Sequence, residues 1–150
     1  MGRLCARTAI LSTACLLLVC GFAGAQTADR PASVIVAIVP GGNADPAYQS
    51  VLRDALMVTL TRSRMRPSAA ATHEDARAAA SRQKADYLVL GSWRNTTETI
   101  ELAIESWLPG GTAPLATGKA SGRISLTLDA VAGEALAAVL PAMQARFPAD

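Results

Sequence analysis

The feature that most constrains the fold of this chain is the run Val34-Ile35-Val36-Ala37-Ile38-Val39, which is apolar at every position and mostly β-branched. A half-buried strand alternates apolar and polar side chains, whereas this run offers apolar side chains to both faces of a sheet. We therefore expect residues 34–39 to form a central strand that is covered on both sides. Pro40 ends the run, and the segment 41–45 is expected to form a loop.

An amphipathic helix is expected after this loop. Asp45 is placed to cap the helix, and Pro46 suits its first position, where a missing N–H is tolerated. The periodicity ends near Arg64. The residues that recur at helical spacing, and that we expect to face the core, are Tyr48, Val51, Leu52, Ala55, Leu56 and Thr59.

The remaining elements give a strand–helix alternation that ends in a meander. Thr72 and Asp75 resemble a capping box at the start of an alanine-rich helix, and Pro141 is expected to kink or shorten the last helix. The order β-α-β-α-β-β-β-α predicts an α/β fold that borders on α+β, in which helices pack on a mixed sheet of about five strands. The elements expected after the first helix are a weak strand over 65–71, a helix over 72–83, strands over 85–93, 98–108 and 115–126, and a helix over 129–146.

Residues 1–25 predict a cleavable export signal. Arg3 and Arg7 make its start basic, and the segment 8–25 is almost wholly apolar. Ala23-Gly24-Ala25 offers the small-x-small pattern that signal peptidase requires. We therefore expect a periplasmic or secreted protein that begins near residue 26.

The predicted signal contains all three cysteines, Cys5, Cys15 and Cys20, so the exported chain is expected to lack thiols, disulfides and cysteine-based metal sites. Lipidation at Cys20 is an alternative that would tether the protein to the outer membrane, although the preceding residues fit a lipoprotein signal poorly. The exported part is expected to consist of a flexible leader over 26–33 and one domain over 34–147.

Charge argues against nucleic acid as a partner. The chain has 14 basic and 12 acidic residues, and removing Arg3 and Arg7 leaves 12 of each, so the exported net charge is zero. The remaining basic residues are scattered, and a nucleic-acid-binding domain would instead show a basic patch or stripe.

Two segments carry a resemblance to a known family. The first is Val39-Pro40 followed by Asp45-Pro46, Tyr48 and Leu52, and the second is Ala85-Asp86-Tyr87-Leu88-Val89-Leu90-Gly91-Ser92. In these segments the chain resembles the TolB amino-terminal-like α/β domains of the cell envelope, whose relatives include CsgG-type and penicillin-binding-protein-activator lipoproteins. The aromatic residue and Ser-Gly that are usual in the first loop of that group are replaced here by Gly41-Gly42 and Ala44. The resemblance implies a non-enzymatic interaction or scaffold module in the envelope.

The loop after the first strand is a candidate ligand site. Open α/β sheets bind ligands at the carboxyl ends of their strands, and a helix amino terminus attracts anions. Neither phosphate-loop fingerprint is present, and Asp45 would repel an anion. Small-ligand binding is therefore the alternative to protein interaction. The residues that would carry it are Gly41, Gly42, Asn43 and Asp45.

No catalytic or metal-binding constellation is expected. His73 is the only histidine, and its neighbours Glu74 and Asp75 would point in other directions on a helix. None of the serines lies in a G-x-S-x-G elbow. Glu101 and Glu105 lie on one face of a strand without apolar enclosure, so they are expected to be solvated. We predict no hydrolase activity, no metal and no cofactor.

Apolar side chains suggest a partner surface instead, either for an envelope protein or for a second copy of the chain. The last helix has an apolar arc that is wide enough for two packing surfaces. Burial of both surfaces in a three-layer fold is the competing interpretation. The residues proposed for this surface are Met57, Trp107, Leu136, Leu140, Met143 and Phe147.

Overall fold

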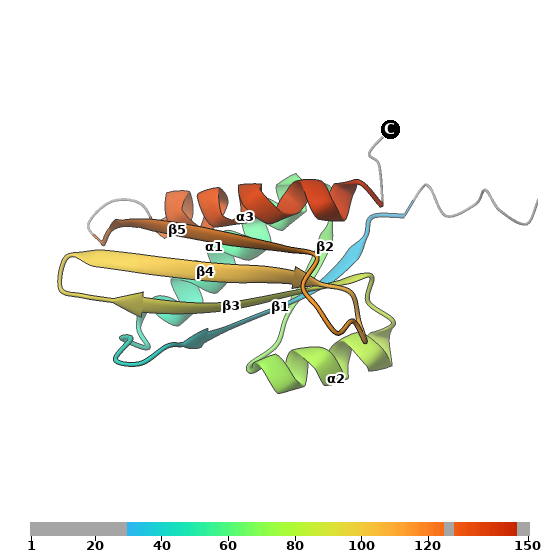
Figure 1. Ribbon diagram of the computed structural model, residues 1–150, viewed down its shortest axis with the longest axis horizontal. Helices are drawn as coiled ribbons and strands as arrows, with labels where there is room; N and C mark the ends of the chain where they lie inside the picture. Colours follow the sequence, from blue (N-terminus) through green and yellow to red (C-terminus); the bar gives the residue numbers. More distant parts are fainter. Residues whose placement is uncertain (1–29, 125–127, 147–150) are drawn as a thin grey trace, which may run out of the picture.

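The computed structural model describes residues 30–124 and 128–146, so the expected signal and Phe147 lie outside the described residues. The predicted order of elements is confirmed, and the fold is α/β with one mixed sheet (Figure 1). The elements are β1 (Ser33–Pro40), α1 (Tyr48–Arg62), β2 (Arg66–Ala69), α2 (His73–Gln83), β3 (Tyr87–Asn95), β4 (Thr99–Trp107), β5 (Ala116–Arg123) and α3 (Leu128–Gln144).

The sheet has five strands in the order β2-β1-β3-β4-β5. β1 pairs in parallel with β2 and β3, whereas β3, β4 and β5 form an antiparallel meander. β1 is an interior strand, and residues 34–38 are each at most 2% exposed. The prediction of a strand covered on both faces is therefore confirmed.

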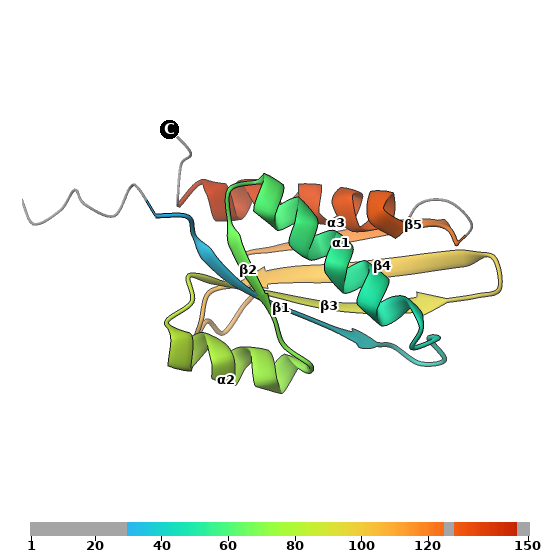
Figure 2. The same ribbon diagram turned by 180° about the vertical axis from the view of Figure 1, so that it is seen from behind.

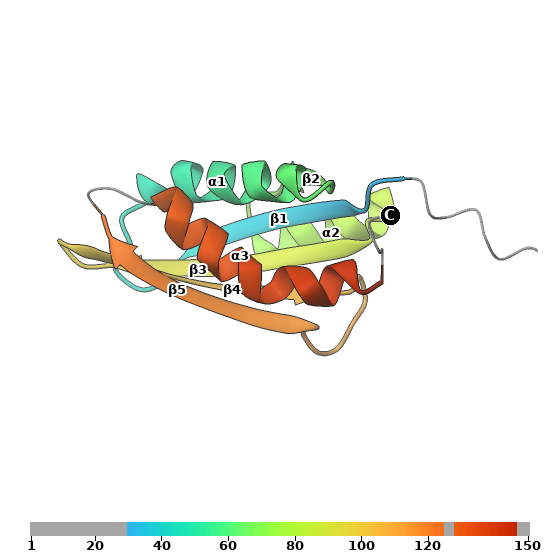
Figure 3. The ribbon, with the colours of Figure 1, turned by 90° about the horizontal axis from the view of Figure 1, so that it is seen from above.

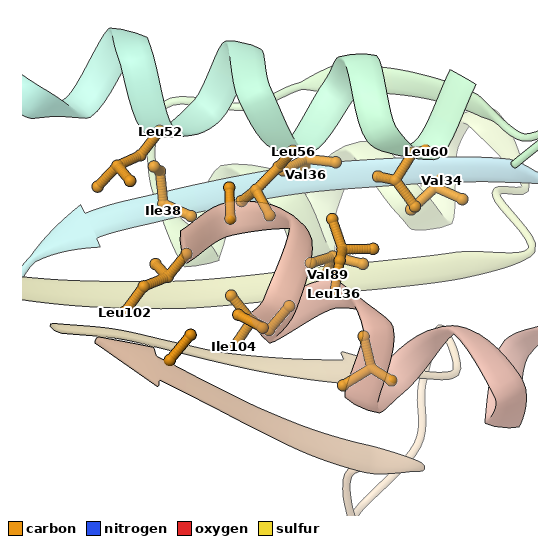
Figure 4. Close-up of a cluster of buried hydrophobic side chains, with 14 of the residues drawn as sticks. Val34, Val36, Ile38, Leu52, Leu56, Leu60, Val89, Leu102, Ile104 and Leu136 are labelled. Atoms are coloured by element: carbon orange, nitrogen blue, oxygen red, sulfur yellow. The ribbon is translucent and has the colours of Figure 1, made fainter. Parts of the chain in front are cut away.

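The helices lie on both faces of the sheet but cover them unequally. α1 and α3 lie together on one face, and α2 lies on the other (Figures 2 and 3). The larger core fills the space between α1, α3 and the sheet, where Leu52, Leu56 and Leu60 of α1 meet Val36 and Ile38 of β1 (Figure 4). A smaller core lies under α2, whose main contacts are with β1 and β3. Within the described residues, no helix therefore lies over β5 or over most of β4 on the α2 face.

The start of α1 differs from the prediction. The helix begins at Tyr48 with Ala47 as its N-cap, and no side chain caps it. The Asp45 carboxylate instead accepts a hydrogen bond from the Ala47 N–H at 2.9 Å, in the turn before the helix. Val51 is 48% exposed, because the helix buries the narrow face formed by Leu52, Leu56 and Leu60. The expectation that Val51 faces the core was wrong.

The carboxyl-terminal helix rests directly on the edge strand. A Cβ atom added to Gly118 of β5 would lie 2.1 Å from the backbone oxygen of Ala135 in α3. Only glycine permits this approach, which gives a structural reason for a glycine inside the strand. α3 continues through Pro141 to Gln144.

The start of α2 agrees with the sequence. The Thr72 hydroxyl accepts a hydrogen bond from the Asp75 N–H at 3.0 Å, as a capping box requires.

Candidate functional site

The most distinctive surface of the molecule is the part of the sheet that α2 leaves open. Side chains alternate along each strand, so the register identifies the residues on this face. Figure 1 looks onto it, with α2 at one end of the sheet and β4 and β5 unobstructed. The residues of this open sheet face are Ser92 and Arg94 of β3, Glu101, Ala103 and Glu105 of β4, and Thr117, Lys119 and Ser121 of β5.

A shallow groove of about 590 Å³ crosses β3, β4 and β5. Its lining includes small side chains, such as Ser92, Ala103 and Ser121, and charged residues of both signs. Glu134 of α3 also contributes to the lining, as does Gly41 at the end of β1. The lining is therefore mixed, because charged residues of both signs lie beside the apolar side chains of Trp93, Leu102 and Ala120.

One exposed ion pair lies across two strands of this face. Arg94 of β3 is directly opposite Glu101 of β4, and the Arg94 Nε donates to the Glu101 carboxylate. Both side chains are at least half exposed, so the pair contributes little to stability. It leaves both charges accessible to a partner.

Trp107, one of the predicted partner residues, is held beneath α2. Its indole Nε1 donates to the Glu105 carboxylate at 3.0 Å, and the Arg77 guanidinium of α2 lies 5.2 Å from the ring centroid. The side chain is half-buried and packs against the smaller core. Trp107 therefore forms the border between α2 and the open sheet face.

The other predicted apolar partner residues lie mostly in the core. Leu136 and Met143 are fully buried, so their assignment to a partner surface was wrong. The reason is that α1 and the sheet together enclose the wide apolar arc of α3. Met57 and Leu140 are half-buried and pack against the same core.

Two large apolar side chains are exposed instead on α1. Val51 and Val58 are each 48% exposed, and neither was predicted as a partner residue. Their spacing of seven residues places them on one side of the helix.

Three backbone N–H groups of the predicted ligand loop donate hydrogen bonds within the fold. The Gly41 N–H donates to the Trp93 backbone oxygen at 2.7 Å, and the Ala44 N–H donates to the Gly41 oxygen at 3.3 Å. The Asp45 N–H donates at 2.7 Å to the side-chain oxygen of Asn95, which the sequence did not single out. Because these donors are used internally, the loop has less to offer an anion than its sequence suggested.

His73 has a structural contact. It is the first residue of α2, and its Nε2 lies 2.8 Å from the Gly91 backbone oxygen in β3. Within residues 30–124 and 128–146, no group of three or more histidine, cysteine, aspartate and glutamate side chains is arranged to hold a metal ion.

Two sets of polar contacts explain the Ala-Asp-Tyr motif. The Asp86 carboxylate accepts hydrogen bonds at 2.8 and 2.9 Å from the backbone N–H and the hydroxyl of Ser33, and it also pairs with Arg30. It thereby joins the starts of β1 and β3. The Tyr87 hydroxyl donates to the Met143 backbone oxygen at 2.8 Å, and burial raises the pKa of Tyr87. Both residues therefore act within the fold.

No family model matches the sequence, and no curated protein matches it. Solved structures do share the fold. A PelC dodecamer from Paraburkholderia phytofirmans superposes with a TM-score of 0.55 at 20% identity, over 77% of this chain and 88% of that one. TolB from Acinetobacter baumannii gives 0.55 at 17% identity, over 76% of this chain and 29% of TolB. The lipoprotein GNA1162 from Neisseria meningitidis gives 0.50 at 14% identity, over 62% of this chain and 81% of that one.

The chain therefore has the TolB-like α/β fold that its motifs implied. In the part of the chain that the structure describes, no helix is long and apolar enough to cross a membrane.

Proposed function

We propose that this protein is an exported, non-catalytic interaction module of the bacterial cell envelope. Residues 1–25 have the pattern of an export signal, which would place the domain in the periplasm. The fold is shared with TolB and with a lipoprotein, and it is shared with PelC, which was solved as a dodecamer. These likenesses support a role in the assembly or maintenance of the envelope.

The observation that carries the proposal is the open sheet face. In a layered α/β domain a helix normally covers each sheet face, and in the part of the chain that the structure describes, β5 and most of β4 have a helix on one side alone. The open face is polar enough to remain in water and carries exposed charges of both signs. Such a surface can exchange water for a polar protein partner without exposing an apolar patch when it is free.

Site-specific photo-crosslinking in the native envelope tests this proposal. A photoreactive phenylalanine derivative at Ala103, in the middle of the open sheet face, is expected to give a covalent protein adduct. The matched control is the same group at Val58, which is exposed on α1 at the opposite face. An adduct from Val58 alone would contradict the assignment of the surface, and no adduct from either position would contradict the function.

Small-ligand binding is a second candidate that one observation favours. Gly41, the first residue of the predicted ligand loop, lines the groove, and the groove volume of about 590 Å³ is within the range of small-molecule sites. A thermal-shift screen with nucleotides, sugars and peptidoglycan fragments tests this candidate. Stabilisation that is lost in Ser92→Tyr, which would fill the groove, would support it, and no stabilisation by any compound would exclude it for these classes.

A further inference from the structure

Basic residues that are scattered along the sequence gather at one end of the fold. Ser33, the first residue of β1, pairs with Arg66, the first residue of β2. β3 starts at the same end, because Val34 pairs with Tyr87. The helices that connect parallel strands run back along the sheet, so α1 and α2 also finish at this end, on the right of Figure 1. α3 finishes there too, since the Tyr87 hydroxyl bonds to the Met143 oxygen.

The exposed charge at this end is positive. Among the described residues, the acidic residue of this end is Asp86, whose side chain is 11% exposed and is bonded to Ser33 and Arg30. The loop over 108–115, which joins β4 to β5 at the same end, contains no charged residue. The exposed basic residues that we call the basic end are Arg30, Arg62, Arg64, Arg66, Arg82, Lys84 and Arg146.

Most of these cations have no partner within the fold. The ion pairs among residues 30–124 and 128–146 use Arg30, Arg53 and Arg94, so the other six cations of the basic end are in none of them. Helix dipoles favour cations in the last helical turn, which accounts for Arg62 and Arg82. The remaining cations lie outside the helices. Their mutual repulsion is uncompensated in the free domain, and their charge is available to a partner.

The excess of positive charge at the basic end has a counterpart at the other end. The exported chain is expected to have equal numbers of basic and acidic residues, so gathering cations at one end leaves the rest of the molecule net negative. Exposed acidic residues of the far end include Asp45 after β1, Glu98 between β3 and β4, and Asp129 in the first turn of α3. A negatively charged surface would therefore orient the domain as well as attract it.

We propose that the basic end docks on the surface of a membrane that contains anionic lipids. Clusters of about four to eight Lys and Arg residues bind anionic headgroups by charge attraction, and the basic end has a cluster of this size. This inference goes beyond the proposed function, because it uses a different surface from the open sheet face.

The path of the chain favours a membrane over other polyanions. The chain enters the fold at the basic end, where Asp86 holds Arg30 at 2.8 Å. The segment before it includes the apolar run over 8–25, which a signal inserts into the membrane during export. The four residues 26–29 can span at most about 14 Å, so the basic end is held near the bilayer while the signal is attached. A lipid on Cys20 would hold the same end near the membrane afterwards.

Docking by this end would direct the groove of the open sheet face away from the membrane. Gly41, which lines the groove, follows the last residue of β1 and therefore lies at the far end of the sheet from Ser33. Arg94 and Glu101 of the groove lie near the same far end. The groove would then remain accessible to a periplasmic partner.

Vesicle cosedimentation of the exported chain tests the proposal. We expect binding to vesicles of equal parts phosphatidylcholine and phosphatidylglycerol, and no binding to vesicles of phosphatidylcholine alone. Binding should be lost at about 1 M salt, where the Debye length is about 3 Å. Equal binding to both kinds of vesicle, or binding to neither, would overturn the proposal.

Arg62→Gln combined with Arg82→Gln removes two charges from the basic end. One basic residue near an anionic surface contributes about fivefold in affinity, so this double variant should bind anionic vesicles about thirtyfold more weakly. The matched control is Arg53→Gln combined with Arg123→Gln, which gives the same net charge but changes the other half of the molecule. The control should bind like the wild type, with folding of both variants checked by circular dichroism. An equal loss in both variants would show that net charge, and not the basic end, controls binding, and would refute the proposal.

An environment-sensitive dye tests the orientation. All native cysteines lie in the predicted signal, so a single dye can be attached to Ser81→Cys in the last turns of α2 or to Thr97→Cys in the β3–β4 turn at the far end. Anionic vesicles should shift the emission of the dye at residue 81 and leave that at residue 97 unchanged. The opposite result would contradict docking by the basic end.

Duplex DNA and inorganic phosphate distinguish a lipid surface from other sources of phosphate. At equal phosphate concentration, tighter binding to DNA than to anionic vesicles would assign the basic end to nucleic acid instead. Release of the chain from vesicles by inorganic phosphate would assign it to a free anion. Crosslinking from Ala103 does not depend on the basic end, so failure of this inference is distinguishable from failure of the proposed function.

Discussion

The contact between Gly118 and α3 gives the sharpest test of the packing. In Gly118→Ala the new Cβ would lie 2.1 Å from the Ala135 oxygen and 3.2 Å from the Ala138 Cβ. The first neighbour is helix backbone, so the clash can be relieved only by moving α3 away from β5. Overpacking of this kind costs about 1–3 kcal/mol, and we expect a loss of that size in the free energy of unfolding.

Gly133→Ala is the matched control, because it places the same methyl group in α3 where no atom lies within 4 Å. Alanine favours a helix interior over glycine by about 1 kcal/mol, so this variant should be unchanged or slightly stabilised. Urea unfolding of the exported chain, followed by circular dichroism, measures both. If Gly118→Ala were as stable as Gly133→Ala, the position of α3 on β5 would be refuted.

Three further predictions concern polar groups that form hydrogen bonds within the fold. Burial raises the pKa of Tyr87, so the folded state retains the phenol proton longer than the unfolded state does. The contribution of Tyr87 to the free energy of unfolding is therefore complete below the pKa of the unfolded state, about 10, and is lost as the pH rises through the pKa of the folded state. Unfolding measured between pH 9 and 11 should show this loss in the wild-type chain and not in Tyr87→Phe. Asp86→Ala leaves the Ser33 N–H without its acceptor and should cost about 1–3 kcal/mol in urea unfolding, and Asp86→Asn should cost less because an acceptor oxygen remains. His73→Ala removes one contact to the Gly91 oxygen and should reduce the free energy of unfolding by about 0.5–1.5 kcal/mol. It should leave crosslinking from Ala103 unchanged. Loss of crosslinking with retained folding would show that the histidine has a functional role.

Local patterns in the sequence were sufficient for the main elements of the fold. Residues 34–38 are apolar on both faces, and that alone predicted an interior strand covered by two layers. The alternation of Ile100, Leu102 and Ile104 with Glu101 and Glu105 correctly separated the core side of β4 from its open side. Both patterns are set by burial, which acts on consecutive residues of one strand.

The errors have a common physical cause. The features that were predicted wrongly depend on contacts between segments that are distant in the sequence. Asp45 is tied to Asn95, fifty residues away, and no local pattern reveals such a bond. Leu136 and Met143 were assigned to a partner surface because the helix alone does not show how much of its arc the sheet and α1 enclose.

The mass of the native chain tests the central claim, that this domain works outside the cytoplasm. The protein is isolated at its natural level from periplasmic, membrane and cytoplasmic fractions, and its amino terminus is determined by intact-mass spectrometry. We expect a chain in the periplasmic fraction that begins at Gln26. It would lack residues 1–25 and with them all three cysteines. A chain that begins with a lipid-modified Cys20 would show that the domain is tethered to a membrane instead of free in the periplasm. An uncleaved chain that begins at Met1 in the cytoplasmic fraction would contradict the account.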